Sequence, residues 1–253
     1  MDWVRTFYDK QDEWTGCCGE EIGAVHRKQA SRVGRALGGR SGRVLELGCG
    51  GGQTAAAIAD LGHTVVAVDI SPRAIDAARQ RAKAHFRGRM EPVLGDFYEI
   101  APEDKFDVVC YFDGFGIGKD DDQRRLLRRI AGWLKRDGSA LIEVYALRYW
   151  ATVAGTEMHF DDASRRYGFD AAGSRLLDTW WPNGHPDEAV TQSLRCYGPA
   201  ELRALLDGTG LELVDIEPGG AVNRKTGEYR RRVPLEQAMS YLATLRVAQS
   251  PAA

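Results

Sequence analysis

Short apolar runs alternate with stretches of helical periodicity through the middle of the chain. Runs rich in valine, leucine and isoleucine predict buried strands at residues 43–47, 63–69, 92–97, 104–113 and 139–146. Between them we expect three helices. Residues 54–61 are mostly small, residues 71–85 begin with an N-cap at Ser71 and with Pro72 at the first helical position, and residues 121–134 have an apolar face. Strands that alternate with helices in this way predict an α/β fold with a parallel sheet, right-handed crossovers and ligands at the carboxyl ends of the strands.

The pattern changes on both sides of this central part. Residues 2–15 are rich in aromatic side chains, which predicts a helix or flap that packs over another surface: Trp3, Phe7, Tyr8 and Trp14. Residues 20–37 predict an amphipathic helix that ends at Gly38 and Gly39, with one apolar face made of Ile22, Val25, Ala30, Val33 and Leu37.

The second half of the chain predicts a different kind of sheet. Residues 147–197 have strand composition interrupted by turn residues, so we expect an antiparallel insertion there. A helix at 199–207 and strands at 211–216 and 239–247 close the chain, although a short helix also fits the last segment.

A glycine-rich turn follows the first predicted strand. Residues 46–52 read Glu-x-Gly-x-Gly-x-Gly, and glycines allow a sharp turn that places no side chain between the backbone and a ligand. Free N–H groups at the start of the next helix can then hold an anionic or polar part of a nucleotide-like molecule. The dinucleotide fingerprint Gly-x-Gly-x-x-Gly fails here because Gln53 stands where the third glycine is needed.

Acidic residues end the next two predicted strands. Asp69 follows Glu46 by 69 − 46 = 23 residues, which is close to the ~20 residues that separate the glycine turn from a ribose-binding carboxylate in βαβ units. Asp96 ends the third predicted strand. Because parallel strands deliver their carboxyl ends to one edge of a sheet, these residues predict a nucleoside site.

Composition sets limits on the class of protein. The 253 residues are 43% hydrophobic and 28% charged, which suits one large α/β domain. The formal net charge of −2 gives no general attraction to nucleic acid or to an anionic membrane. No apolar run approaches the ~18 to 20 residues of a membrane span, and the acidic, aromatic N-terminus is unlike a secretory signal.

Five cysteines are present, at positions 17, 18, 49, 110 and 196. They form no Cys-x-x-Cys pair, and no histidine stands at metal-ligand spacing, so we expect a reduced, cytoplasmic protein without a metal. The adjacent Cys17 and Cys18 would be reactive only in a microenvironment that the sequence does not reveal.

The segment from Glu46 to Gly52 resembles motif I of the class I S-adenosylmethionine-dependent methyltransferases. Residues 43–146, and more loosely 199–247, are similar to their Rossmann-like fold, a mostly parallel seven-stranded sheet whose last strand is antiparallel. The resemblance implies S-adenosyl-L-methionine as cofactor and S-adenosyl-L-homocysteine as product. It also implies one methyltransferase domain over residues 1–253, with a helical lid (1–40), a cofactor-binding core (41–146), a substrate-side insertion (147–197) and a closing helix and strands (198–253).

Roles of the family's residues carry over to matching positions. Gly48, Cys49 and Gly50 would approach the methionine part through the main chain, and Glu46 would support its amino group. The ribose and adenine would be bound by Asp69, Ile70, Asp96 and Phe97. Phe112 and Asp113 follow the fourth strand and would border the transferred methyl group.

The acceptor class is inferred mainly from missing motifs. An Asn/Asp-Pro-Pro-Tyr/Phe motif for base amines does not follow the fourth strand, and no paired-glutamate loop typical of protein arginine methyltransferases follows Asp113. The pattern is similar to natural-product tailoring methyltransferases of bacteria, so we expect a small-molecule acceptor, with an amine nitrogen favoured over oxygen or carbon. A homo-oligomer is compatible with the sequence.

Candidate residues for the acceptor side come from the lid, the insertion and the strand ends. Tyr8 and His159 could act in catalysis, as groups that orient or deprotonate a nucleophile. Substrate contacts are expected from Trp14, Asp113, Phe115 and Tyr145. Alternatives left open are an RNA or protein methyltransferase, for which the basic loop at 224–232 is the argument, and a non-catalytic cofactor-binding protein.

Overall fold

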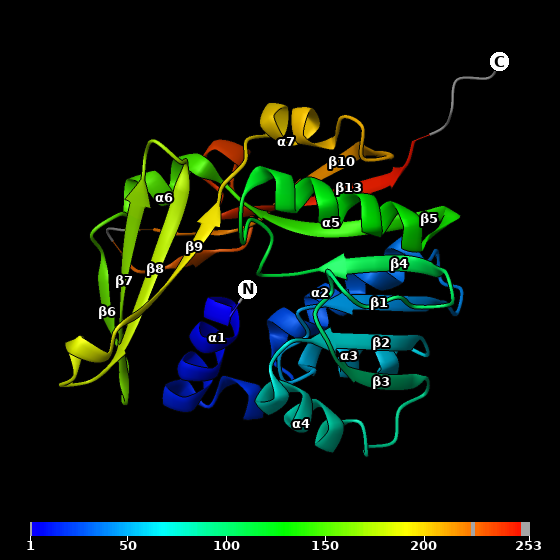
Figure 1. The fold of residues 1–253 in the computed structure, drawn as a ribbon, viewed down its shortest axis with the longest axis horizontal. Coiled ribbons are helices and arrows are strands. Elements are labelled where there is room, and N and C mark those ends of the chain that lie inside the picture. The colour runs from blue at the N-terminus through cyan, green and yellow to red at the C-terminus, as the bar shows by residue number, and fades with distance from the viewer. Residues whose placement is uncertain (1, 224–225, 249–253) are drawn as a thin grey trace.

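The computed structural model describes residues 2–223 and 226–248. In these residues a seven-stranded sheet runs in the order β10-β13-β5-β4-β1-β2-β3 (Figure 1). Its strands are β1 (Arg43–Leu47), β2 (Thr64–Asp69), β3 (Arg89–Leu94), β4 (Phe106–Tyr111), β5 (Leu134–Tyr145), β10 (Leu211–Pro218) and β13 (Ser240–Val247). Neighbouring strands are parallel except in the two pairs that contain β13. The predicted fold class, with the last strand antiparallel, is confirmed.

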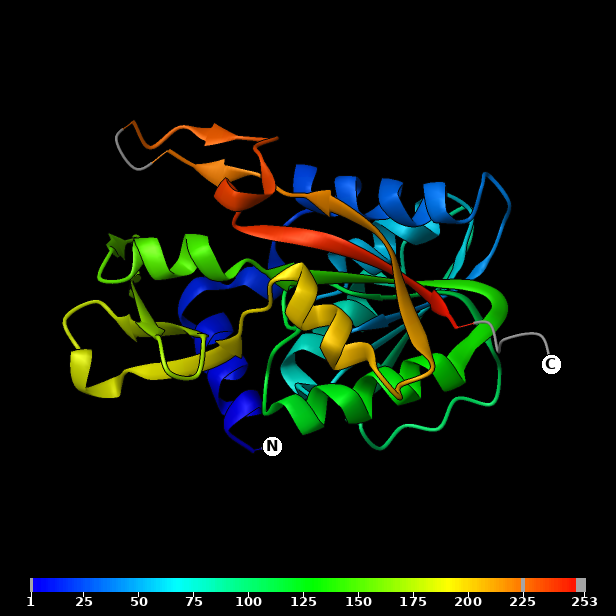
Figure 2. The same ribbon diagram turned by 90° about the horizontal axis from the view of Figure 1, so that it is seen from above.

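Apolar side chains on alternate positions of the central strands cover both faces of the sheet. Leu45 and Leu47 pack with α5 (Asp120–Trp133) and α7 (Pro199–Leu206), whereas Val44 packs on the opposite side. That second side is covered by α2 (Ala24–Ala36), α3 (Gln53–Asp60) and α4 (Pro72–Arg81). Figure 2 shows α2 and α5 on opposite sides of the sheet. A sheet buried on both faces leaves its strand ends as the place for a ligand.

The predicted antiparallel insertion is also present. A four-stranded sheet is formed by β6 (Glu157–His159), β7 (Ala163–Asp170), β8 (Arg175–Pro182) and β9 (Val190–Arg195), and a 3₁₀ turn, η2 (Pro186–Glu188), precedes β9. Helix α1 (Asp2–Thr15) and the 3₁₀ turn η1 (Cys17–Gly19) lie between this sheet and the carboxyl edge of the central sheet (Figure 1). The insertion and the N-terminal helix thus enclose the strand ends from one side.

Several boundaries differ from the prediction. Strand β3 ends at Leu94, so Asp96 lies in the following turn, where its carboxylate accepts the Tyr98 N–H at 2.8 Å. Helix α2 starts at Ala24 instead of Glu20, and α4 ends at Arg81 instead of His85. Strand β5 begins directly after α5, five residues before Ser139. Val25 is exposed, so it does not belong to the buried face of α2 that Ala30 and Val33 form.

Short elements that the pattern did not predict complete the chain. Helix α6 (Leu147–Val153) opens the insertion, ahead of its strands. Strand β11 (Ala221–Val222) pairs with β12 (Tyr229–Arg230), which lies within the basic segment 224–232 that was expected to be a loop. A 3₁₀ turn, η3 (Leu235–Gln237), leads into β13, which is a strand and not a helix. Arg224 and Lys225 of the basic loop lie outside the described residues.

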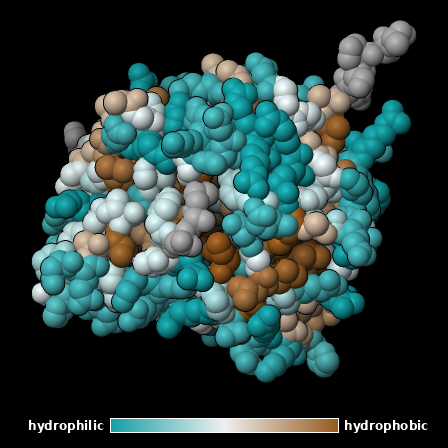
Figure 3. Space-filling view, viewed as in Figure 1, coloured by the Kyte–Doolittle hydropathy of each residue, from teal (hydrophilic) through white to brown (hydrophobic). Residues whose placement is uncertain are grey.

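The surface is mainly hydrophilic on the face that Figure 3 shows. Hydrophobic residues gather there over the edge of the sheet, where Val93 and Leu94 of β3 are exposed. Among the described residues, no helix combines the length and the apolar character needed to cross a lipid bilayer.

Candidate functional site

The glycine turn between β1 and α3 has the backbone that its sequence requires. Gly48, Gly50 and Gly52 have φ values of 64°, 53° and 79°, in the left-handed region that side chains disfavour. A Cβ atom on Gly48 would come 3.3 Å from the Tyr111 ring. Because the turn carries no side chain at these positions, a ligand can approach the main chain directly.

The carboxylate at the end of β2 supports this turn. Asp69 Oδ2 accepts the Gly50 N–H at 2.8 Å, and Asp69 Oδ1 accepts the Ser71 N–H at 2.9 Å. Burial raises the pKa of Asp69, while the backbone N–H groups of Ser71 and Gly50 act in the opposite direction. Asp69 therefore links the glycine turn to the start of α4 and still faces the cavity described below.

Glu46 is a buried acid with an unused oxygen. Its side chain is only 3% exposed, and its Oε2 atom has no hydrogen-bond partner. Burial raises the pKa of Glu46 to about 8, with a further contribution from the negative charge of Asp69. A buried carboxylate without a partner is costly, so this position is suited to a positively charged ligand group.

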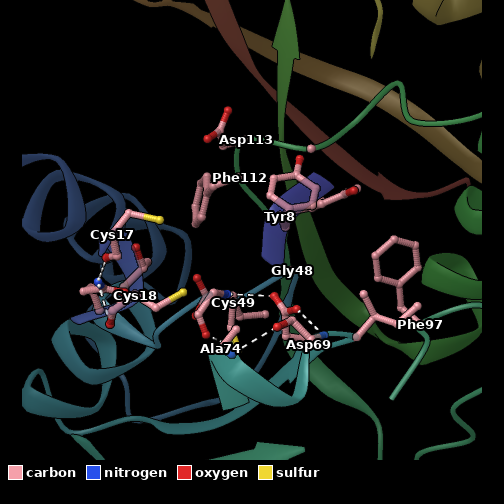
Figure 4. Close-up of a pocket in the computed structure, with 18 of the residues that line it drawn as sticks. Tyr8, Cys17, Cys18, Gly48, Cys49, Asp69, Ala74, Phe97, Phe112 and Asp113 are labelled. Carbon is pink, nitrogen blue, oxygen red and sulfur yellow. Dashed lines mark hydrogen bonds between the residues drawn. The ribbon is translucent and has the colours of Figure 1, made fainter. Parts of the chain in front are cut away.

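These residues line one cavity of about 430 Å³ at the carboxyl edge of the sheet, a volume typical of small-molecule sites. All of the residues expected to bind the cofactor reach it: Glu46, Gly48, Cys49, Gly50, Asp69, Ile70, Asp96, Phe97 and Phe112. Figure 4 shows Asp69 and Cys49 on one side of the space and Phe112 and Asp113 on another. The structure therefore brings together the residues for which the sequence predicted nucleoside contacts.

A group of acids and tyrosines occupies the end of the cavity beyond Phe112. Asp113 follows β4 with a φ of 59°, a strained value for a residue other than glycine. The Tyr145 hydroxyl donates a hydrogen bond to Asp113 Oδ1. Solvent reaches Asp113 through the cavity, yet the surrounding protein raises its pKa to about 6, chiefly by burial. Glu143 of β5 lines the same cavity.

The N-terminal helix covers this end. Tyr8 lines the cavity, and its hydroxyl donates to Gln192 Oε1 of β9 at 3.0 Å. Gln192 in turn donates to Asp178 at 3.0 Å, and Asp178 is fully buried in an ion pair with Arg165. Because the Tyr8 proton points to Gln192, the lone pairs of its oxygen are free to accept a hydrogen bond from the cavity.

The charges around the cavity have one sign. Its acidic residues are Glu46, Asp69, Asp96, Asp113 and Glu143, and no lysine or arginine is among the described residues that line it. The one histidine there, His26, accepts the Gly23 N–H on Nδ1 at 3.0 Å, and burial lowers its pKa. The cavity is therefore suited to a cation.

Three predicted residues lie away from the cavity. His159 is exposed on β6, where its Nδ1 lies 2.8 Å from Ser164 Oγ, and it is not among the residues that line the cavity. Phe115 is fully buried in the core, against Tyr197 and Tyr111. Trp14 packs against the small cluster of Phe7, Ala163 and Trp180, where α1 meets the insertion. Tyr145 reaches the site through its bond to Asp113.

Other residues of the cavity were not predicted. Gln29 of α2 and Thr54 of α3 are joined by a hydrogen bond of 2.7 Å, and Tyr111 ends β4. Cys17 and Cys18 also line the cavity. For Tyr111 and Glu143 the alternation of side chains near the ends of β4 and β5 was an available signal. For Gln29 and the cysteines the sequence held no comparable signal, because long-range packing brings them to the site.

Comparison with known families agrees with this geometry. The model of a family described as methyltransferase domain matches residues 44–138. A magnesium-protoporphyrin O-methyltransferase from Rhodobacter capsulatus is 37% identical over 100 residues, which are 40% of this chain and 43% of that protein. A cypemycin N-terminal methyltransferase from a Streptomyces species is 37% identical over 111 residues, 43% of each chain. The similarity thus spans less than half the length of these relatives.

Solved structures extend the likeness to almost the whole chain. The CcbJ methyltransferase from Streptomyces caelestis has a TM-score of 0.70 at 24% identity and covers 92% of this chain and 98% of its own. A 1,6-didemethyltoxoflavin-N1-methyltransferase from Burkholderia thailandensis has a TM-score of 0.59 at 21% identity, and the match covers 98% of this chain and 86% of that protein. The match to the methyltransferase-domain model thus covers residues 44–138, and the fold of the chain is the one that these solved methyltransferases share.

Proposed function

We propose that the protein transfers the methyl group of S-adenosylmethionine to an amine nitrogen of a small molecule, as tailoring enzymes of natural-product pathways do. The observation that carries the proposal is the cavity itself. It joins a glycine turn and three carboxylates at one end to an acidic, aromatic chamber at the other, and no lysine or arginine lines it among the described residues.

The cofactor half of the cavity fits S-adenosylmethionine group by group. Glu46 Oε2 is buried without a partner, as expected of an acceptor for the amino group of the methionine part. Asp69 is placed for the ribose hydroxyls, since a carboxylate can accept from both in charge-assisted hydrogen bonds. Ile70 and Phe97 offer apolar contact to the adenine, and Asp96 offers an acceptor for its exocyclic amine. When bound, this cofactor supplies an electrophilic methyl group on a positively charged sulfur.

The acceptor half fits a protonated amine. Asp113, held by the Tyr145 hydroxyl, can pair with an ammonium group, and aromatic rings at Tyr8 and Phe112 can contact its charge. An amine must lose a proton before its lone pair can attack. A carboxyl whose pKa is raised to about 6 can receive that proton more readily than an ordinary aspartate. The remaining contribution of the chain is to align the amine with the methyl group and to exclude water.

The relatives support a small-molecule acceptor. The names of the solved neighbours include a 1,6-didemethyltoxoflavin-N1-methyltransferase and a glycopeptide N-methyltransferase. Names among the sequence relatives also include a magnesium-protoporphyrin O-methyltransferase and a ubiquinone biosynthesis O-methyltransferase. Transfer to a hydroxyl is therefore the second candidate. An amine is favoured over an acidic phenol because the described residues that line the cavity include no lysine or arginine.

Methyl transfer to a panel of acceptors tests the proposal. Purified protein is incubated with S-adenosylmethionine that carries a labelled methyl group and with matched pairs of small molecules that differ only in an amine or a hydroxyl. We expect label in the amines and none in the hydroxyl partners. Label in hydroxyl compounds alone would support the second candidate, and cofactor binding without transfer to any acceptor would contradict both.

A further inference from the structure

A cluster of metal-binding groups lies beside the cavity and has no role in the proposed reaction. It consists of Asp12 near the end of α1 and of Cys17 and Cys18 in η1, and their ligand atoms all lie within 4.8 Å of one another. Asp12 is buried, and both cysteines are half-buried. Neither cysteine forms a disulfide.

The spacing of the cluster is close to that of a tetrahedral site. Zn²⁺ binds thiolate sulfur at about 2.3 Å and carboxylate oxygen at about 2.1 Å, which places two such ligands about 3.6 Å apart at the tetrahedral angle. The Cys17 sulfur lies 3.7 Å from Asp12 Oδ1. The Cys18 sulfur lies within 4.8 Å of the ligand atoms of the other two residues.

The carboxylate is already oriented by its neighbours. Asp12 Oδ1 accepts the Cys18 N–H at 2.7 Å, and Asp12 Oδ2 is paired with Arg73 of α4. Such outer contacts are typical of metal ligands, because they fix the direction in which the ligand points. Two thiolates and one carboxylate carry three negative charges, which a divalent cation and the Arg73 guanidinium balance.

The segment that carries the thiols is fixed by hydrogen bonds from side chains of α3 and α4. The Gln53 side chain donates to the Cys17 carbonyl at 2.8 Å, and Arg81 donates to the Glu20 carbonyl at 2.7 Å. A Cβ atom on Gly51 would lie only 2.0 Å from the Cys18 carbonyl oxygen, so η1 rests directly on the glycine turn. These contacts arrange the ligands before any cation binds.

Both cysteines line the cavity, and Figure 4 shows their thiols directed toward its interior. A cation held by the three side chains would therefore keep its fourth position open on the cavity side. Three protein ligands with one open position is an arrangement that Zn²⁺ commonly adopts.

We propose that Asp12, Cys17 and Cys18 form a binding site for one thiophilic divalent cation of the Zn²⁺ class at the wall of the cavity. Binding replaces the two thiol protons, which leave to solvent, and forms two metal–sulfur bonds and one metal–oxygen bond without any change of oxidation state. The cation joins α1 to the segment that rests on the glycine turn. The sequence alone predicted no metal, because the site combines adjacent cysteines with an aspartate and matches no familiar spacing.

Zn²⁺ binding to the reduced, chelator-treated protein tests the site without any methyl transfer. We expect saturable binding of one Zn²⁺ per chain in competition with a chromophoric zinc indicator. A disulfide reagent should modify two thiols of the native protein, Cys17 and Cys18, because the other three cysteines are buried. Saturating Zn²⁺ should protect both thiols.

Single substitutions identify which side chains bind Zn²⁺. Cys17→Ser and Cys18→Ser each replace sulfur by a smaller, harder oxygen and should weaken Zn²⁺ binding at least tenfold, as should Asp12→Asn. Asp76→Asn is the matched control, because it removes an exposed carboxylate of α4 that pairs only with Arg79 across one turn, and it should bind as the unmodified protein does. Circular dichroism checks that each variant is folded.

Two results would overturn the proposal. One is the lack of saturable Zn²⁺ binding by the folded, reduced protein. The other is equal Zn²⁺ affinity in the unmodified protein and in a folded double variant that carries Cys17→Ser and Cys18→Ser. Either result leaves the proposed methyl transfer untouched, because no step of that reaction uses the cation.

Discussion

Glu46→Gln gives a quantitative test of how the cavity receives its cofactor. The carboxyl is buried, its Oε2 atom has no partner, and its pKa is raised to about 8. At pH 7, one unit below this pKa, about nine in ten molecules of the free protein hold Glu46 protonated. The positive amino group of S-adenosylmethionine favours the charged form, so binding should expel about one proton.

The expected loss of affinity follows from two opposing contributions. A hydrogen bond to a charged partner contributes ~1.5–3 kcal/mol. Deprotonation of Glu46 at pH 7 costs one pKa unit, about 1.4 kcal/mol. The difference predicts that Glu46→Gln weakens cofactor binding by ~0.1–1.6 kcal/mol, or at most about 15-fold.

The same substitution has an opposite effect on the stability of the free protein. A carboxyl with a folded-state pKa near 8 and an unfolded pKa of 4.5 binds more protons in the folded state over that interval. The free energy of unfolding therefore falls as pH rises from 4.5 to 8, and glutamine removes this dependence. As pH rises from 5 to 8, the free energy of unfolding of the unmodified protein should therefore fall by on the order of 3 kcal/mol relative to that of the variant.

Calorimetry and denaturant unfolding measure these quantities. Titration of S-adenosylmethionine in two buffers with different ionisation enthalpies gives the number of protons released. We expect about one for the unmodified protein and none for Glu46→Gln. Equal proton release by both proteins would refute the assignment of Glu46 to the amino group.

Three further predictions concern neighbouring positions. Asp69→Asn places an amide NH₂ against the N–H of either Gly50 or Ser71, so the Kd of S-adenosylmethionine should rise at least tenfold by calorimetry, and an unchanged Kd would contradict the ribose role. Asp113→Asn should lower kcat/KM for an amine by ~10- to 150-fold and abolish the acid limb of the pH profile. In the unmodified protein that limb should lie near pH 6, because Asp113 is charged only above its pKa of about 6; a limb that persists in the variant would argue against this role. Gly51→Ala should lower the free energy of unfolding by ~1–3 kcal/mol, because its methyl group meets the Cys18 carbonyl, whereas the exposed helical Gly132→Ala, with open space around it, should be neutral or stabilising; equal effects of the two would count against close packing of η1 on the turn.

The local pattern of apolar and polar residues predicted the central sheet, because most of its strands are short, apolar and followed by a polar or glycine-containing turn. That regularity also placed Glu46, Asp69 and Asp96 at one edge, since parallel strands align their carboxyl ends. The predicted end of β3 was wrong because the bond from the Gly95 N–H to the Asp69 carbonyl is the last of the β2–β3 ladder, and the Asp96 carbonyl already accepts the Glu99 and Ile100 N–H groups in the turn that follows. Helix α6 is only seven residues long, too short for its periodicity to stand out.

The acceptor side was harder to predict, because contacts distant in sequence decide which side chains reach it. Phe115 lies two residues after Asp113 in a glycine-rich turn, and its packing against Tyr111 and Tyr197 shows that it turns into the core. His159 was placed by its neighbours in the sequence, whereas β6 pairs with β7 and holds it beside Ser164. Tyr8 reaches the cavity because α1 docks against β9 through Gln192, a residue 184 positions away.

A structure of the protein crystallised with S-adenosylhomocysteine tests the central claim most directly. We predict that the nucleoside lies in the cavity with its ribose hydroxyls on Asp69, its adenine between Ile70 and Phe97, and its amino group on Glu46, so that the sulfur faces Asp113 and Tyr8. An empty cavity at saturating ligand, or a nucleoside bound elsewhere on the chain, would contradict the account.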